Sequence, residues 1–151
     1  MNETTPNVKS AEDLRMMILK RELEEMAKRD AERSKKDDQL RKFADDFLTK
    51  HVTDEERAAI QKLVQNAVNN GKFEALVYSF PSDLCTDSGR AIHNHESFWP
   101  ETLQGKAREL YDRYVEVAKP QGYKLKASII NFPGGMPGDV GLFLNWEEDR
   151  I

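Results

Sequence analysis

The sequence predicts an α+β fold in which two helices precede a small βαββ unit. Three observations favour it. Residues 10–48 form a long charged segment without glycine or proline, the composition changes after Gly71, and three segments rich in aromatic and β-branched residues follow. A chain of 151 residues has room for one domain and an extension. Because 33% of the residues are charged, we expect part of the chain to contribute nothing to the core.

The segment 10–48 is expected to form one long helix. Ser10, followed three residues later by Asp13, is typical of a helix N-cap. Apolar residues gather at both ends of this helix, while AKRDAERSKKDDQ between them has no apolar stripe. A helix that is polar all round does not pack on a core. We therefore interpret residues 1–50 as a helical arm that pairs with another copy, stays free in solvent or packs on its own domain.

A second helix is expected over residues 53–70. Thr53 and Glu56 fit the capping box, and Gly71 follows as a left-handed stop signal. His51 falls in the break between the two helices, where we expect an exposed linker residue. One face of the second helix is apolar at three- and four-residue spacing, and its members are Ile60, Leu63, Val64, Ala67 and Val68.

The rest of the compact domain, which we place at residues 51–151, has three strand-like segments and a third helix. The strands are expected at 73–80, 123–132 and 140–146, and the helix at 100–119. The span between the first two strands is long enough for a helical crossover, which allows them to lie parallel. The third strand follows a short loop and is expected to pair antiparallel. The result is a small mixed three-stranded sheet.

Both of the first two strands leave the sheet through a Phe-Pro pair, Phe80-Pro81 and Phe132-Pro133. If these strands are parallel, the loops that follow them meet at one edge. These loops are 81–99, which contains DLCTDSGRAIHNHESFW, and 133–139, PGGMPGD. Ligands of open α/β sheets bind outside the carboxyl ends of the strands. We therefore expect a ligand or partner site at this edge, the alternative being a long loop that only covers it.

The candidate site combines cationic side chains with free backbone amides. Arg90, the histidines and the Gly134-Gly135 amides could converge on a phosphate or carboxylate, whereas the nearby acids would repel one. The glycine-rich loop satisfies no nucleotide-binding fingerprint. The candidate ligand-binding residues are Asp83, Asp87, Arg90, His93, His95, Gly134, Gly135 and Asp139.

Cys85, His93 and His95 also raise the question of a metal or a nucleophile. Their Cys-x7-His-x-His spacing matches none of the common zinc patterns, and the chain has one cysteine. We therefore expect no metal and no cofactor. As an enzyme, the protein would use Cys85 as a thiolate with either histidine as its base. Nothing in the sequence marks this cysteine as activated, so an enzyme remains the alternative.

Composition restricts the class of partner. A net charge of −4 argues against binding nucleic acid through bulk electrostatics. A single cysteine favours a reducing compartment, and no apolar run is long enough to cross a bilayer. We therefore expect a cytoplasmic protein that does not associate with membranes.

These observations favour a small cytoplasmic binding or regulatory module that acts through the sheet edge and the helical arm. Three strands and one helix form a thin core, and domains of that size are marginally stable alone. We therefore expect a homodimer, with a protein or a small anionic ligand as the further partner. The alternative is the small enzyme based on Cys85, His93 and His95.

Overall fold

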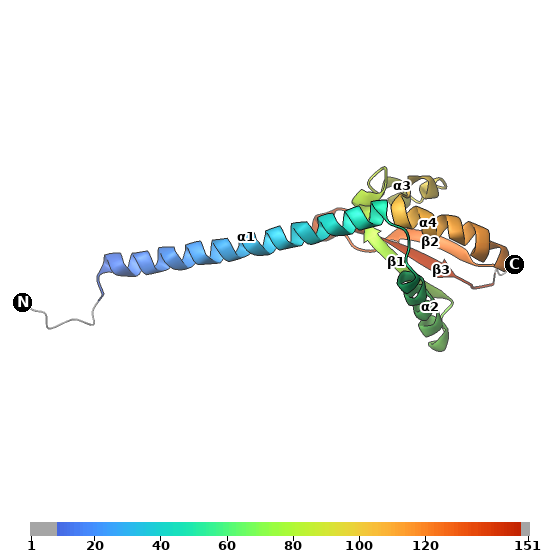
Figure 1. Ribbon diagram of the computed structural model, residues 1–151, viewed down its shortest axis with the longest axis horizontal. Coiled ribbons are helices and arrows are strands. Elements are labelled where there is room, and N and C mark those ends of the chain that lie inside the picture. The colour runs from blue at the N-terminus through green and yellow to red at the C-terminus, as the bar shows by residue number, and fades with distance from the viewer. Residues whose placement is uncertain (1–8, 149–151) are drawn as a thin grey trace, which may run out of the picture. The chain divides into compact units, whose positions relative to one another are not determined.

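The computed structural model describes residues 9–148 and has the expected α+β fold (Figure 1). Its contacts divide the chain into two units, with the boundary after Phe43, whereas the sequence suggested a boundary at residue 50. The first unit contains most of helix α1 (Ala11–Thr49). The second contains the last turn of α1, all the other helices and the sheet.

Helix α1 begins with the expected cap. The backbone N–H of Asp13 donates to Ser10 Oγ at 3.0 Å, and the N–H of Ser10 donates to Asp13 Oδ2 at 3.4 Å. Residues 9–43 are all exposed, which agrees with the absence of a core-facing stripe. Ion pairs such as Arg21–Glu25 and Arg29–Glu25 support the helix on its own surface.

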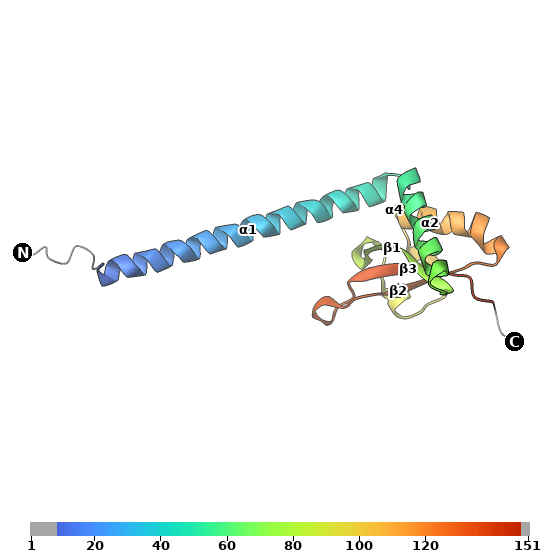
Figure 2. The same cartoon turned by 90° about the horizontal axis from the view of Figure 1, so that it is seen from below.

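Helix α2 (Asp54–Asn69) begins with the expected capping box. Thr53 Oγ1 accepts the backbone N–H of Glu56 at 3.1 Å, and the Glu56 carboxylate accepts the N–H of Thr53 at 3.2 Å. The helix packs on strand β1 (Glu74–Pro81) through its apolar face. Helix α2 and helix α4 (Gly105–Arg113) cover the same face of the sheet (Figure 2).

The sheet differs from the expected mixed sheet because all of its pairing is antiparallel. Strand β3 (Asp139–Asn145) lies between β1 and β2 (Lys124–Ile129) and pairs antiparallel with both. The two outer strands therefore run in the same direction, as expected, but they are not neighbours. Phe80 and Ile129 both lie opposite Val140, so both outer strands end at the same edge. The loops after them meet there despite the different strand order.

Helix α4 starts later than the expected residue 100. Pro100 belongs to a separate 3-10 turn, Trp99–Thr102, and Leu103 is extended before α4 begins. Gly105 makes this entry possible, because its φ is +54° and a Cβ there would lie 2.0 Å from the carbonyl oxygen of Phe47. After Arg113 the helix continues as a π-helical segment, Tyr114–Ala118.

The core lies between the helices and one face of the sheet. Phe47, from the last turn of α1, is only 1% exposed, and its ring lies 5.1 Å from that of Phe80. Val140 and Leu142 of the central strand are buried beside it. The last turn of α1 therefore contributes directly to the core of the second unit.

Candidate functional site

The crossover segment 82–102 is folded, although the sequence suggested a long loop without regular structure. It contains a 3-10 turn, Ser82–Leu84, and a short helix α3 (Arg90–His93), followed by the turn Trp99–Thr102. Ala91 and Ile92 of α3 are buried and fix the segment to the core. Its polar side chains are therefore displayed from a fixed backbone.

This segment contacts the glycine-rich loop. The backbone N–H of Ser82 donates to the carbonyl of Gly138 at 2.9 Å, and its hydroxyl donates to the carbonyl of Pro137 at 3.3 Å. The rings of His93 and Phe132 meet edge to face, with centroids 5.6 Å apart. The two loops that follow the outer strands thus lie side by side at one end of the sheet.

The acidic candidates mostly hold these loops in shape. Asp87 accepts the backbone N–H groups of Gly89 and Ala91, at 3.0 and 2.8 Å, and so caps the start of α3. Asp139 accepts a hydrogen bond from the Asn131 amide at 2.9 Å. Asp83 is exposed. Two of the three carboxylates therefore have a local structural role that needs no ligand.

The cationic and glycine candidates are all on the surface. Arg90, His93 and His95 are exposed, and His95 has a left-handed backbone with φ of 57°. Gly134 and Gly135 also have positive φ, and open space surrounds the position of a Cβ at each. Within residues 9–148, no three His, Cys, Asp or Glu side chains are grouped as metal ligands would be. Cys85, His93 and His95 thus do not form a preassembled metal site.

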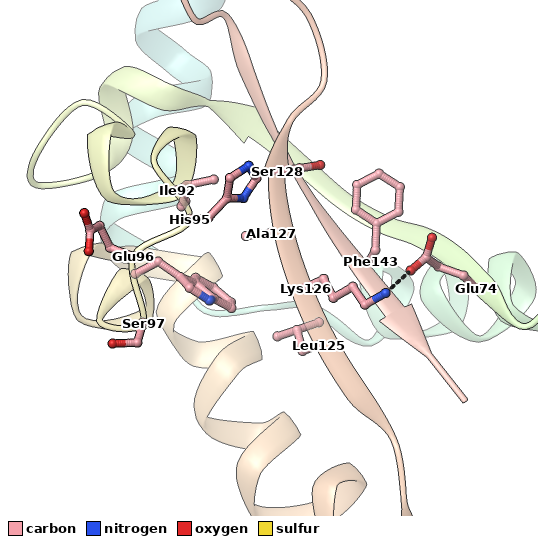
Figure 3. Close-up of a pocket in the computed structure, with 11 residues that line it drawn as sticks. Glu74, Ile92, His95, Glu96, Ser97, Leu125, Lys126, Ala127, Ser128 and Phe143 are labelled. Atoms are coloured by element: carbon pink, nitrogen blue, oxygen red, sulfur yellow. Dashed lines mark ion pairs between the residues drawn. The ribbon is translucent and has the colours of Figure 1, made fainter. Parts of the chain in front are cut away.

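A hollow of about 480 Å³ lies between strand β2 and the segment that follows α3 (Figure 3). Of the candidate residues, His95 alone lines it, together with Glu96 and Trp99 from the same segment. On the sheet side, Lys126 pairs with Glu74 at 3.4 Å across the strands. Figure 3 shows His95 and the Lys126–Glu74 pair on opposite sides of Ala127.

Strand β2 is an edge strand, so along this hollow alternate backbone groups have no strand partner among the residues that the structure describes. Trp146 donates to Phe73 on the β1 side, while Ile130 donates to Asp139 on the β2 side. In an antiparallel ladder, successive residues of a central strand point alternately to their two neighbours. The residues of β2 whose backbone N–H and C=O groups hydrogen-bond to β3 are therefore 124, 126 and 128. Leu125, Ala127 and Ile129 direct their N–H and C=O groups to the open edge.

Cys85 lies in an environment that keeps its thiol protonated. It is 3% exposed, and burial raises the pKa of the Cys85 thiol to about 11 from an ordinary value of 9.0. Nucleophilic cysteines have the opposite property, a lowered pKa and access to solvent. The environment therefore favours a packing role for Cys85.

A charged cluster that the sequence reasoning missed lies beneath the start of α4. The ammonium group of Lys106 is almost fully buried and lies 2.9 Å from Asp46 Oδ2 and 2.6 Å from Glu56 Oε1. The hydrogen bond from Lys106 lowers the pKa of Asp46, and it lowers that of Glu56 against the opposing effect of burial. One signal was available in the sequence: in the helix expected over 100–119, Lys106 falls on the apolar stripe, between Leu103 and Ala107. The cluster links α1, α2 and α4.

Comparison with known proteins gives no match: no family model fits the sequence, and neither a curated relative nor a solved structure resembles the chain. Within residues 9–148, no helix combines the length and the apolar character needed to cross a bilayer.

Proposed function

We propose that this protein is a cytoplasmic binding module without enzymatic activity, which self-associates through its helical arm and binds a partner at the edge of its sheet. One observation carries the proposal. Every residue from 9 to 43 is exposed, including a group of large apolar side chains between residues 14 and 26. Contiguous exposed apolar patches mark interaction sites in soluble proteins.

Four of these side chains form a seam. Met16, Leu19, Leu23 and Met26 follow one another at spacings of three, four and three residues, so they lie along one side of the helix. Each is between 47% and 58% exposed. This is the spacing with which two helices pack knobs into holes. A second copy of the same segment would cover the seam.

The seam is short, which limits the strength of the proposed contact. The next positions of the same spacing are Asp30, Arg33 and Asp37. Charged residues at the centre of a helix pair lower its stability. We therefore propose a homodimer held by the segment 16–26, with an association that depends on protein concentration in the range used for solution measurements.

Sedimentation of two variants tests this contact. Leu19→Lys with Leu23→Lys places two charges in the seam and is expected to give a monomer at concentrations where the parent chain is a dimer. Ile18→Lys is the matched control, because Ile18 is also exposed, at 60%, in the same segment of the helix but does not follow the spacing of the seam. A double variant that sediments like the parent chain would remove the basis of the proposal.

For the second component, we propose that the edge formed by loops 81–99 and 133–139, continued by β2, binds an extended segment of a protein partner. The contact between the two loops and the hollow beside β2 support it. The opposite edge strand, β1, has an irregular register between Leu76 and Tyr78 and ends in Pro81, features that hinder strand addition. The β2 register is regular from Lys124 to Ile129. Strand addition requires such a regular edge with free backbone groups.

Peptides selected from a displayed random library for binding to the parent chain can test whether the β2 edge binds an extended segment. Proline at position 127 removes an N–H that points to the open edge and leaves the β3 ladder intact. Peptides selected on the parent chain are expected to lose at least about tenfold in affinity for Ala127→Pro. Ser79→Pro is the control, since it removes an outward N–H from the other edge. Equal binding to the parent and to Ala127→Pro would contradict strand addition.

The local chemistry favours binding over the enzyme alternative, and a small anionic ligand remains within the proposal. The buried, protonated Cys85 lacks the properties of a nucleophile, whereas Arg90, His93 and His95 stay available on the surface. Alkylation of the native protein checks this. Cys85 is expected to react much more slowly with iodoacetamide than the same thiol in urea.

A further inference from the structure

A second cavity lies in the domain and shares one lining residue, Leu125, with the hollow beside β2. It has a volume of about 210 Å³ and lies between α2, α4 with its π-helical continuation, and the covered face of the sheet. Ile60, Val77, Leu110 and Val117 are among the apolar side chains that line it. Cavities of drug-sized ligands are larger, at about 300–1,000 Å³, so this one suits a short apolar group.

Two arginines connect this apolar cavity to a polar hollow. Arg57 and Arg113 line both the cavity and a neighbouring hollow of about 710 Å³. The polar hollow is lined by four cationic side chains, Lys50, Arg57, Arg108 and Arg113, and by three carboxylates, Glu109, Asp112 and Glu116. Three of these cations already have carboxylate partners, Lys50 with Asp46, Arg57 with Asp54 and Arg108 with Asp112, so Arg113 is the cation most accessible to a ligand where the two spaces meet. Apolar walls on one side and guanidinium groups on the other are complementary to an amphiphile with an anionic head.

The side chain of Arg57 has a buried hydrogen-bond donor that a ligand could satisfy. Its Nη1 lies 3.0 Å from Asp54 Oδ1 and its Nη2 lies 3.9 Å from Glu109 Oε1. Its Nε is buried and has no hydrogen-bond partner among the described residues. A buried donor without an acceptor is costly, and such groups in native proteins call for an explanation. An acceptor oxygen supplied by a ligand would relieve this cost.

The wall between α4 and Lys119 also has an unusual conformation. Tyr114–Ala118 form a π-helical segment, and Tyr114 and Val117 line the cavity. Such segments are rare and often occur at functional sites. Arg113, the residue just before this segment, makes no ion pair with any side chain of residues 9–148, so its guanidinium is available to a ligand.

We propose that the cavity binds a medium-chain fatty acid, with its alkyl chain between α2 and the π-helical segment and its carboxylate at Arg57 and Arg113. The carboxylate accepts hydrogen bonds from both guanidinium groups, as paired arginine–carboxylate contacts do elsewhere. The proposal uses neither the arm nor the open backbone groups of β2, so it does not depend on the function proposed above.

Titration calorimetry of the full chain with octanoate, below its micelle concentration, tests the proposal. Octanoate is expected to bind saturably at one site per chain. Octylammonium has the same chain with the opposite charge, and butyrate has the same head with a shorter chain. Both are expected to bind at least about tenfold more weakly. Absence of saturable octanoate binding, or equal binding of octylammonium, overturns the proposal.

Three variants locate the site. Val117→Trp fills the cavity from a side chain that is 44% exposed, so the fold should tolerate it, and it is expected to abolish octanoate binding. Arg113→Gln keeps the size of the side chain without its charge and should weaken binding about tenfold. Lys62→Gln removes an exposed charge of α2 outside the cavity and serves as the control. If Val117→Trp and Arg113→Gln both bind octanoate like Lys62→Gln, the acid binds elsewhere and the assignment is wrong. Binding that is lost in Arg113→Gln supports the site even if Val117→Trp does not fold.

Discussion

Asp87 was a candidate ligand by its sequence position, and the structure gives it two backbone hydrogen bonds at the start of α3. Carboxylates that cap a helix or a turn stabilise it because they satisfy N–H groups that have no partner within the helix. An acid two residues before a glycine in a loop therefore needs no ligand to account for it. Asp83, four residues earlier, is exposed and provides a matched comparison.

Removing the cap gives a prediction. Asp87→Ala leaves the N–H groups of Gly89 and Ala91 without their acceptor and is expected to lower the free energy of unfolding by about 1 kcal/mol. Urea unfolding at neutral pH measures it. Asp83→Ala, the control, should change the free energy of unfolding by less than about 0.5 kcal/mol. Equal effects of the two substitutions would show that Asp87 does not act as a cap.

The buried thiol of Cys85 is expected to make the free energy of unfolding depend on pH in the alkaline range. Burial raises its pKa to about 11 in the folded chain, from an ordinary value of 9.0. The native state therefore holds this proton more tightly than the unfolded state. The contribution of this thiol to the free energy of unfolding is present below pH 9 and is lost as pH rises through about 11; the full loss is about 2–3 kcal/mol. Unfolding of Cys85→Ala in urea should show a weaker loss of stability between about pH 8.5 and pH 10 than the parent chain. Parallel pH profiles would contradict this.

At the scale of elements, short-range signals in the sequence were reliable. The caps at Ser10 and Thr53 were predicted because each involves residues only three positions apart. Strand direction was also predicted correctly, since a crossover helix allows the two outer strands to run the same way. Strand order was wrong, because direction does not determine which strand lies between the others. The antiparallel hairpin of β2 and β3 brings β3 to the centre.

Contacts between residues that are distant in sequence were missed, because no short-range pattern specifies them. Lys106 lies far along the chain from Asp46 and Glu56, and nothing local in the sequence links them. Likewise, the hollow beside β2 combines His95 with Lys126 and Glu74, which only the sheet register brings together. The sequence indicated which loops form the candidate edge. It did not indicate which of their side chains already make hydrogen bonds within the fold.

The Lys106 cluster gives a prediction for acidic pH. The pKa values of Asp46 and Glu56 are lowered in the folded chain, so their contribution is present above their ordinary values of 3.8 and 4.5 and is lost as pH falls below them. Lys106→Met removes the shared cation. The stability of this variant should vary less than that of the parent chain from about pH 5 to about pH 2, and it should be lower at neutral pH. Lys62→Met, at an exposed position of α2, should keep the parent profile, and an unchanged profile in Lys106→Met would contradict the linkage.

At the scale of the whole molecule, the division of the chain after Phe43 determines what can be removed. The last turn of α1 lies inside the second unit, where Phe47 contacts Phe80 and Tyr78 and Asp46 pairs with Lys106. The rest of the helix is exposed along its length. The arm therefore serves association in our proposal, while its last turn serves folding of the domain.

Two truncated chains test this division. A chain that begins at Ala44 retains Phe47 and is expected to unfold cooperatively in urea with the midpoint of the parent chain. A chain that begins at Lys50 lacks Phe47, and loss of a buried phenylalanine side chain costs about 3–5 kcal/mol. It should be unfolded or far less stable, and Phe47→Ala in the full chain should reproduce most of that loss. The comparison is made at a concentration where the parent chain is monomeric, because dimerisation would add its own stability. If the chain that begins at Lys50 unfolds at the parent midpoint, Phe47 does not contribute to the core, and the boundary at residue 50 that the sequence suggested would be the functional one.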